Sequence, residues 1–165
     1  MRCLRLQWCI WACIKSPAAS LFGTGPCWGW SSQELLGWIQ YGGGKQLFNE
    51  LMNSLKLNLV SFFNSPKPAQ PLGWFKEQIT KPSQMKDLKF RSEGLAAEVF
   101  AEMGMSVAQL PGGKITQAMK SGEIVAAEFN NPTSDSDLGM QDVSKHYYLA
   151  SFHQSQECFE ITYNK

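Results

Sequence analysis

The 165-residue sequence has no surplus of basic residues, because 15 Lys and Arg residues stand against 14 Asp and Glu residues. Proteins that bind nucleic acid use clustered basic side chains to neutralise phosphates, so nucleic acid is not expected as a partner. The sequence also lacks a run of about 18 to 20 apolar residues, the length that crosses a bilayer as a helix. We therefore do not expect the chain to be an integral membrane protein.

Closely spaced zinc ligands are missing as well. The two histidines, His146 and His153, lie in a region that is separate from most of the cysteines, and no Cys-x-x-Cys pair occurs. Zinc sites need such pairs, so the thiols are expected to be small buried or incidental residues. The five cysteines are Cys3, Cys9, Cys13, Cys27 and Cys158.

Sequence signatures of catalysis are also absent. Gly42-Gly43-Gly44-Lys45 lacks the spacing of a phosphate-binding loop, and Gly23-Thr24-Gly25 is followed by Pro26 where a dinucleotide fold would begin a helix. No Gly-x-Ser-x-Gly sequence is present, and neither histidine lies near an evident nucleophile. An enzyme is therefore the weaker hypothesis.

What the sequence does contain is typical of a folded globular protein, with 44% hydrophobic and 12% aromatic residues. Its beginning is unusual. Residues 1–14 combine Arg2 and Arg5 with a short apolar run from Trp8 to Ile14, which faintly resembles a secretory signal. From the residues alone, 1–14 stay open between a secretory signal and an atypical N-terminus.

Two helices are predicted before the first strand. Ser31-Ser32-Gln33-Glu34 is typical of a capping box, and apolar residues over 35–39 continue it as a helix that Gly42-Gly43-Gly44 ends. A second apolar stripe predicts a helix over 45–55.

Strands then alternate with helices. Residues 57–63 are apolar on both faces, which predicts a strand in the centre of a sheet, and the two prolines of Asn64–Pro68 predict a loop. Helices of about ten residues between strands imply right-handed crossovers, so the fold class is α/β with mainly parallel sheets. The remaining expected elements are strands at 88–91, 106–110 and 124–129 and helices at 95–103 and 114–120.

Three polar side chains lie where expected elements meet turns. Arg91 ends a strand, a position where ligand sites form in parallel sheets and where a guanidinium can grip a carboxylate through two hydrogen bonds. Alternatively, Arg91 is a surface residue that pairs with Glu93 or Glu98. Glu128 ends an apolar strand, where it can ligate a cation or accept a hydrogen bond from a ligand, or it is solvated just past the sheet. Gln70, in a loop with prolines, binds a ligand or faces water.

The order of five short sequences resembles that in the periplasmic solute receptors of TRAP (tripartite ATP-independent periplasmic) transporters of the DctP type. The resemblance covers roughly residues 15–165. The sequences are Tyr41–Gly44, Gln70 with Gly73–Phe75, Met85–Arg91, Leu110–Gly113 and Ser121–Glu128.

This resemblance implies a two-lobed α/β receptor of the class II-like periplasmic type, which closes on a small organic acid and delivers it to a membrane permease. It implies that Arg91 pairs with the ligand carboxylate. It further implies that Gln70, Glu128 and the backbone carbonyl of Phe129 hold a Na⁺ or Ca²⁺ ion that touches the ligand, with no other cofactor. Further expected ligand-site residues are Trp74, Phe129, Asn131 and His153.

The sequence departs from the keto-acid-binding branch of that family. Glu128-Phe129-Asn130-Asn131-Pro132 stands where that branch reads Glu-Trp-Val-Gly-Pro, and Arg91-Ser92-Glu93-Gly94 stands where it reads Arg-Ile-Pro-Gly. The first of these resembles the branch labelled mannitol or chloroaromatic transport, which implies an aromatic or hydroxylated carboxylate as ligand.

Receptors of this family are longer than this chain, so we expect it to be truncated at both ends. On this interpretation residues 1–14 are an atypical, non-native segment rather than a true signal peptide. Residues 15–56 would be part of lobe I, 57–127 would be lobe II, and 128–165 would return across a hinge. By resemblance the protein is expected in the periplasm. Two alternatives remain: a small α/β enzyme with Glu128 and His153 as acid and base, and an inactive fragment.

Overall fold

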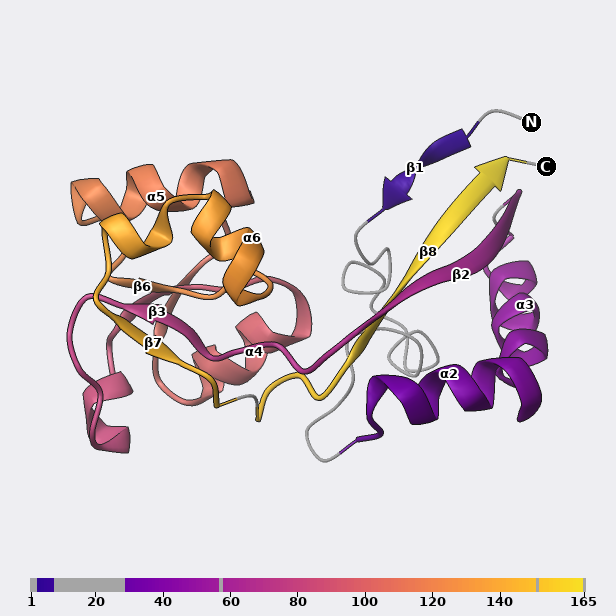
Figure 1. The fold of residues 1–165 in the computed structure, drawn as a ribbon, viewed down its shortest axis with the longest axis horizontal. Coiled ribbons are helices and arrows are strands. Elements are labelled where there is room, and N and C mark those ends of the chain that lie inside the picture. Colours follow the sequence, from indigo (N-terminus) through magenta and orange to yellow (C-terminus); the bar gives the residue numbers. More distant parts are fainter. Residues whose placement is uncertain (1–2, 8–28, 57, 151, 165) are drawn as a thin grey trace. The chain divides into compact units, whose positions relative to one another are not determined.

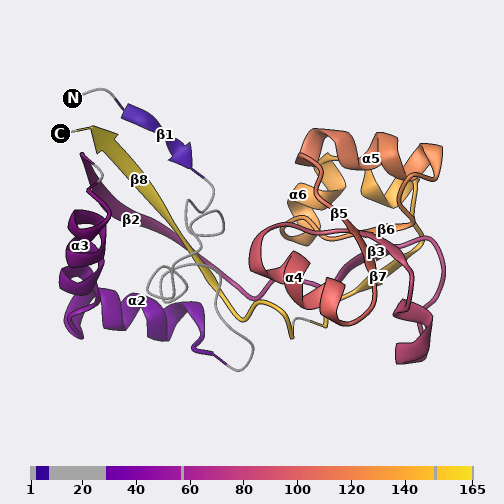
Figure 2. The same ribbon diagram turned by 180° about the vertical axis from the view of Figure 1, so that it is seen from behind.

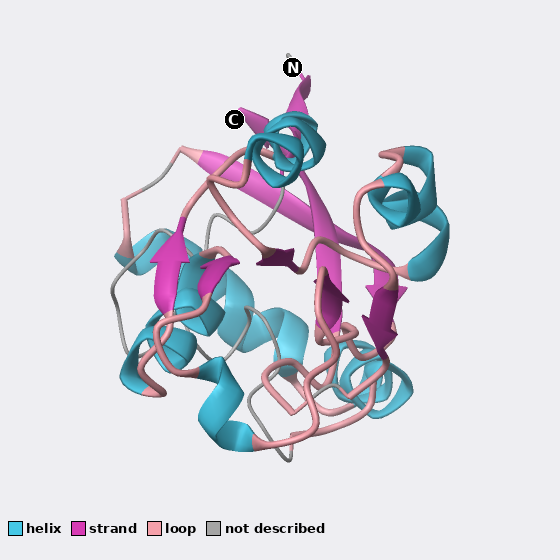
Figure 3. Cartoon of the chain, turned by 90° about the vertical axis from the view of Figure 1, so that its left-hand side faces the viewer, coloured by secondary structure: helices cyan, strands magenta, loops and turns pink. Residues whose placement is uncertain are grey.

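The computed structural model describes residues 3–7, 29–56, 58–150 and 152–164. The chain divides into unit 1, which comprises Met1–Ala69 with Gln154–Lys165, and unit 2, Gln70–His153 (Figure 1). Each unit combines helices with a sheet (Figure 3), which confirms the α/β class. The expected lobe boundaries stay a prediction. The boundaries between the two units lie at residues 69/70 and 153/154.

Unit 1 contains a three-stranded antiparallel sheet in the order β1-β8-β2. The strands are β1 (Cys3–Gln7), β2 (Leu59–Lys67) and β8 (Glu157–Asn164). The long strands β2 and β8 run side by side (Figures 1 and 2), paired from Leu59↔Asn164 to Lys67↔Glu157. The pairing therefore ends a few residues short of the unit boundaries at 69/70 and 153/154.

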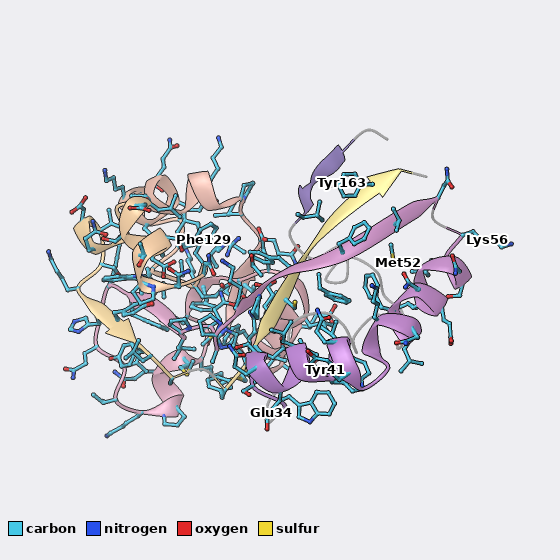
Figure 4. The ribbon with its side chains drawn as sticks, turned by 45° about the vertical axis from the view of Figure 1, so that its right-hand side comes forward. Glu34, Tyr41, Met52, Lys56, Phe129 and Tyr163 are labelled. Atoms are coloured by element: carbon cyan, nitrogen blue, oxygen red, sulfur yellow. The ribbon has the colours of Figure 1, made fainter. Side chains whose placement is uncertain are left out.

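Two helices belong to this unit, α2 (Ser32–Tyr41) and α3 (Gly44–Ser54). The predicted capping box is confirmed, since the Ser31 hydroxyl accepts from the Glu34 amide and the Glu34 carboxylate accepts from the Ser31 amide. The core includes Leu35 and Ile39 of α2 with the buried thiol of Cys158, as expected for that cysteine. Figure 4 labels Met52 of α3, which is buried, and Tyr41 at the end of α2, which is exposed.

Two predictions about β2 are wrong. Within the described residues β2 pairs with β8 alone and lies at the edge of its sheet, because an apolar run does not by itself distinguish an edge strand from a central one. The strand also continues through the predicted loop to Lys67. The register shifts between Phe63 and Pro66, and a proline is tolerated at such an irregularity of an edge strand.

Unit 2 contains a five-stranded sheet in the order β5-β4-β6-β3-β7. Parallel pairing joins β4 (Lys89–Arg91) to β5 (Ser106–Ala108) and to β6 (Ala126–Ala127), as the alternation of strands and helices predicted. However, β3 (Gly73–Phe75) pairs antiparallel with β6 and with β7 (His146–Tyr148), so the sheet is mixed rather than mainly parallel. The helices are α4 (Gly94–Glu102), α5 (Gly112–Ser121), α6 (Pro132–Asp137) and the short 3₁₀ helices η2 (Pro82–Met85) and η3 (Met140–Asp142).

This sheet separates two apolar cores. Phe75, Phe90 and Ala126 share one face and pack with Phe100 of α4. The neighbouring residues along these strands point to the other face, where Ala127 and the ring of Trp74 pack with residues of α5. Figures 1 and 2 accordingly show α4 on one side of the sheet and α5 on the other. Arg91, next to Phe90, therefore lies on the α5 side.

Several sequence-based expectations fall outside the described residues: the apolar run Trp8–Ile14, three of the cysteines, and the Gly-rich stretch up to Trp28. Among the described residues, no helix has both the length and the apolar character that spanning a membrane requires.

Gly73 of β3 can be tested as a constraint on the sheet. Its φ is +120°, and an added Cβ would lie 2.9 Å from Glu128 Cα and in still closer contact with the Ala127 carbonyl oxygen. We expect Gly73→Ala to lower the free energy of unfolding by at least about 2 kcal/mol, because the backbone of β6 cannot yield as a flexible side chain would. Urea denaturation measures this change.

Gly113→Ala is the matched control, since an added Cβ there meets nothing within 4 Å and the residue lies in α5. It is expected to be neutral or to stabilise the protein by less than about 1 kcal/mol. Equal effects of the two substitutions would contradict the assigned role of Gly73.

Candidate functional site

The candidate site forms where β4 and β6 end side by side. Arg91, the last residue of β4, pairs in parallel register with Ala127, the last residue of β6. Glu128 follows directly, and its amide donates to the Arg91 carbonyl. The predicted strand over 124–129 is thus shorter than expected, and its end brings Glu128 beside Arg91.

The guanidinium of Arg91 is buried and surrounded by oxygen atoms. Nε donates to the Leu110 carbonyl at 2.8 Å, and Nη1 donates to the Glu128 carbonyl at 2.9 Å and to its Oε1 at 3.2 Å. Nη2 lies 2.6 Å from Oε1 of Glu93. The pairing with Glu93 that sequence analysis held open is thus present, but the side chain of Arg91 is only 3% exposed. Arg91 is therefore not a surface residue.

Glu128 is the second charged group of the cluster, and it is 4% exposed. Burial raises the pKa of Glu128 to about 7, and the positive charge of Arg91 only partly offsets this effect. A buried carboxylate is costly because it loses hydration, so the group is poised between its charged and neutral forms near neutral pH. Any added positive charge at this position would favour the charged form.

Gln70 joins the cluster from the loop before β3. Its Nε2 donates to Oε2 of Glu128 and, at 2.9 Å, to the carbonyl of Phe129. One polarised N–H₂ group thus bridges the two oxygens that were predicted to hold a cation. Carboxylate, amide and carbonyl oxygens suit a hard cation such as Na⁺ or Ca²⁺, and rotation of the amide would present the Gln70 oxygen instead.

These donors therefore fit a cation. No group of three or more His, Cys, Asp or Glu side chains that could hold a metal ion occurs in the part of the chain that the structure describes. The candidate site instead combines one carboxylate with an amide and a backbone carbonyl.

The ring of Phe129, labelled in Figure 4, contacts both Arg91 and the start of α5. The guanidinium carbon of Arg91 lies 5.8 Å from its centroid, within the range of a cation–π contact. An added Cβ on Gly112 would lie 2.8 Å from Cζ of this ring. The glycine at the start of α5 therefore makes room for the ring.

Sequence analysis missed Asp135, a carboxylate that organises the segment after Glu128. Asp135 is 1% exposed; its Oδ1 accepts from the Asn130 amide at 3.1 Å and its Oδ2 from Trp74 Nε1 at 3.2 Å. Burial raises the pKa of Asp135, and these hydrogen bonds oppose the rise. Trp74 also stacks on Tyr147, with ring centroids 4.5 Å apart. Trp74 is thus held in place by its own contacts.

Asn131 has a structural role in this fold. As the N-cap of α6, its side-chain oxygen accepts from the amides of Thr133 and Ser134, at 3.1 Å each. The Asn-Pro pair is accordingly typical of a helix start. A ligand contact by Asn131 would have to use its Nδ2, and it stays a prediction.

His153 is not brought to the cluster. Its ring packs 5.2 Å from that of Phe100, which in turn contacts Phe90 on the face of β4 opposite to Arg91. His153 is 5% exposed, and burial lowers its pKa to about 4. Among the described residues neither ring nitrogen has a hydrogen-bond partner. His153 therefore faces the α4 core as a neutral ring.

The cluster of Gln70, Arg91, Glu128 and Phe129 can bind an anion and a cation together. Arg91 offers charge-assisted donors, while Glu128 and the Phe129 carbonyl offer oxygens. His153, the base that an enzyme was expected to use, lies on the other face of the sheet.

A model of the family DctP, described as bacterial extracellular solute-binding protein, family 7, matches residues 29–164. The monocarboxylate 2-oxoacid-binding periplasmic protein of Nostoc sp. is 33% identical over 150 residues, which cover 91% of this chain and 40% of that protein.

Two solved TRAP periplasmic solute-binding proteins are also similar. The protein from Colwellia psychrerythraea, with bound calcium and pyruvate, has a TM-score of 0.83 and 28% identity, with 95% of this chain and 46% of that one covered. The protein from Pseudoalteromonas atlantica, with bound sodium and pyruvate, has a TM-score of 0.77 and 28% identity, with 88% and 43% covered. The chain spans less than half the length of these relatives.

The raised pKa of Glu128 predicts a pH dependence of stability. From pH 4.5, its ordinary value, to about 7, the folded protein holds this proton more tightly than the unfolded protein. The contribution of Glu128 to the free energy of unfolding therefore falls as the pH rises from 4.5 to about 7. The decrease is at most about 1.4 kcal/mol per pH unit. Urea denaturation at several pH values should show a smaller decline for Glu128→Gln than for the unchanged protein.

Glu157 in unit 1 also has a pKa raised to about 7, so the difference between the two proteins, not the absolute slope, is the readout. The exposed Glu123, substituted by Gln, is the control and should leave the slope unchanged. Parallel pH profiles for Glu128→Gln and the unchanged protein would show that Glu128 ionises normally.

Proposed function

We propose that this chain, which belongs to the DctP family of bacterial extracellular solute-binding proteins (family 7), binds a small organic acid as a receptor of a TRAP-type transporter. The observation that carries the proposal is the buried guanidinium of Arg91 at the end of β4, beside Glu128 and Gln70. In this proposal Arg91 binds the ligand carboxylate. The protein works in the periplasm and passes its ligand to membrane permease subunits.

The proposed ligand class is the monocarboxylates, with 2-oxoacids foremost. The Nostoc relative is named for such ligands, and both solved relatives carry pyruvate. The sequence from Glu128 to Pro132 instead resembles the mannitol or chloroaromatic branch, so a hydroxylated or aromatic acid is the second candidate. Phe129 beside Arg91 offers an apolar face to either class.

Charge balance supports the presence of a cation in the liganded state. Arg91 already faces two carboxylates, Glu93 and Glu128, so a ligand carboxylate would add a third negative charge to one positive charge. A Na⁺ or Ca²⁺ ion held by Gln70, Glu128 and the Phe129 carbonyl would compensate for it. Both solved relatives contain such an ion with their pyruvate. No other cofactor is required.

Arg91 alone does not supply the affinity of a receptor. A charge-assisted hydrogen bond contributes about 1.5 to 3 kcal/mol, whereas micromolar binding needs about 8 kcal/mol. The cation and desolvation by apolar rings would add the rest. Phe129 is placed for such a contact, and Trp74 supports it through Asp135 and the segment that carries Phe129.

An enzyme acting on a carboxylate is the weaker candidate. It would need Glu128 and His153 as acid and base, yet His153 packs on Phe100 across the sheet from Arg91. The family itself is one of solute-binding proteins. A ligand recovered chemically unchanged after long incubation agrees with a receptor, and conversion of the ligand would favour the enzyme. An inactive fragment would bind none of the candidate acids.

Substitution of Arg91 tests the receptor proposal directly. Arg91→Lys keeps the charge but loses the planar fork, and we expect the dissociation constant for pyruvate, measured by calorimetry, to rise at least about 10-fold. Arg91→Ala should abolish binding. Lys89→Ala is the control, because it removes an exposed charge from the same strand. Unchanged pyruvate binding by a folded Arg91→Lys protein would refute the role of Arg91.

Removal of cations tests the second part of the proposal. Pyruvate binding should weaken in a sodium-free buffer with a chelator and recover when calcium or sodium is added, because the ion offsets the charge of the ligand. Glu128→Gln should reduce this dependence, since it removes the charged ligand of the cation. Equal pyruvate affinity with and without both cations would contradict the proposed ion and leave Arg91 as the one charged group that binds the ligand.

A further inference from the structure

Glu93 occupies the donor of Arg91 that a ligand would need. Its Oε1 lies 2.6 Å from Nη2 of Arg91, the shortest contact of the guanidinium. The side chain of Arg91 is 3% exposed, whereas that of Glu93 is 51% exposed. The contact therefore joins a buried cation to a carboxylate that remains in solvent.

The other partners of Arg91 are fixed by the fold. Leu110 and Glu128 accept through backbone carbonyls, and the Glu128 carboxylate is itself buried and bound by Gln70. Release of any of these would leave a buried polar group without a partner, which is costly. Within the described residues, Glu93 is the one side-chain partner of Arg91 that is itself exposed, so its carboxylate regains hydration when it leaves, and Nη2 stays paired only if a ligand carboxylate takes its place.

The side chain of Glu93 has no capping role that would compete with its contact to Arg91. Glu93 is the N-cap residue of α4, yet its side chain accepts no capping hydrogen bond from that helix. The next residue, Gly94, has φ of +63°, which lets the chain turn from β4 into α4. The turn keeps the Glu93 side chain next to Arg91, so the contact is local and re-forms readily.

We propose that Glu93 sets the affinity of the site, as an internal carboxylate that holds Nη2 of Arg91 until a ligand carboxylate displaces it. This inference rests on the proposed function, in which Arg91 binds the ligand carboxylate. The ligand then competes with a group of the same chemistry, and its apparent affinity is reduced by the fraction of molecules in which Glu93 is released. The exposed carboxylate moves into solvent, where it is hydrated.

The expected size of the effect follows from the exposure of Glu93. The ligand carboxylate takes the place of Glu93 at Nη2, so we expect the competitor to matter on the order of a solvent-exposed ion pair, about 0.2 to 1 kcal/mol, which corresponds to roughly 1.4- to 5-fold in affinity. The contact therefore weakens binding without preventing it. An uptake receptor with such a competitor releases its ligand more easily than one with an open guanidinium.

The experiment compares Glu93→Gln with the unchanged protein, using sodium pyruvate as the probe and calorimetry as the measurement. The substitution keeps the length of the side chain but removes its negative charge, so the dissociation constant should fall roughly 1.4- to 5-fold. The matched control is Glu98→Gln on α4, which removes an equal charge from an exposed residue. It should leave the dissociation constant unchanged. Circular dichroism checks that all three proteins are folded.

Each outcome decides between the hypotheses. Equal or weaker binding by Glu93→Gln, while the unchanged protein binds pyruvate, overturns the competition but leaves the receptor proposal intact. An equal increase in pyruvate affinity in Glu98→Gln would show a general effect of net charge, and it would also overturn the proposed competition by Glu93. If no protein binds pyruvate or any other candidate acid, the proposed function fails, and this inference fails with it.

Discussion

The burial of one guanidinium at the end of β4 is the constraint on which the rest of unit 2 depends. A buried positive charge without partners would cost several kcal/mol, so the fold surrounds Arg91 with the carbonyls of Leu110 and Glu128 and with two carboxylates. The parallel register of β4 and β6 puts those groups within reach. The end of the sheet is thus fixed by electrostatics as much as by packing.

The same arrangement supports the proposal that the site binds a charged ligand. Polar groups that are already oriented need little rearrangement when a ligand arrives, and the low exposure of Arg91 and Glu128 strengthens their interactions. Gln70 adjusts to the charge state, since one end of its amide donates and the other accepts. A cation and an anion can therefore enter together where either alone would leave a net charge.

Sequence analysis singled out Arg91 and Glu128 because they are polar residues at the ends of apolar strands, and the resemblance to the receptor family added Gln70 and the Phe129 carbonyl. The capping box at Ser31 could also be predicted from the sequence, since its hydrogen bonds are local. Contacts between segments far apart in the sequence could not be predicted. Asp135 lies in a Ser- and Asp-rich stretch that resembles a solvated turn, and only the fold shows that it holds Trp74. His153 was expected at the ligand site, yet its place is decided by the Phe100 core.

The glycine at position 112 has a consequence for how such sites diversify. The ring of Phe129 fills the space where a side chain at 112 would stand, so the two positions share a single volume. A side chain at 112 thus requires a smaller residue at 129, and a ring at 129 requires glycine at 112. Substitution of Gly112 alone would clash with the ring, whereas paired changes at 112 and 129 can move the filled volume from one position to the other.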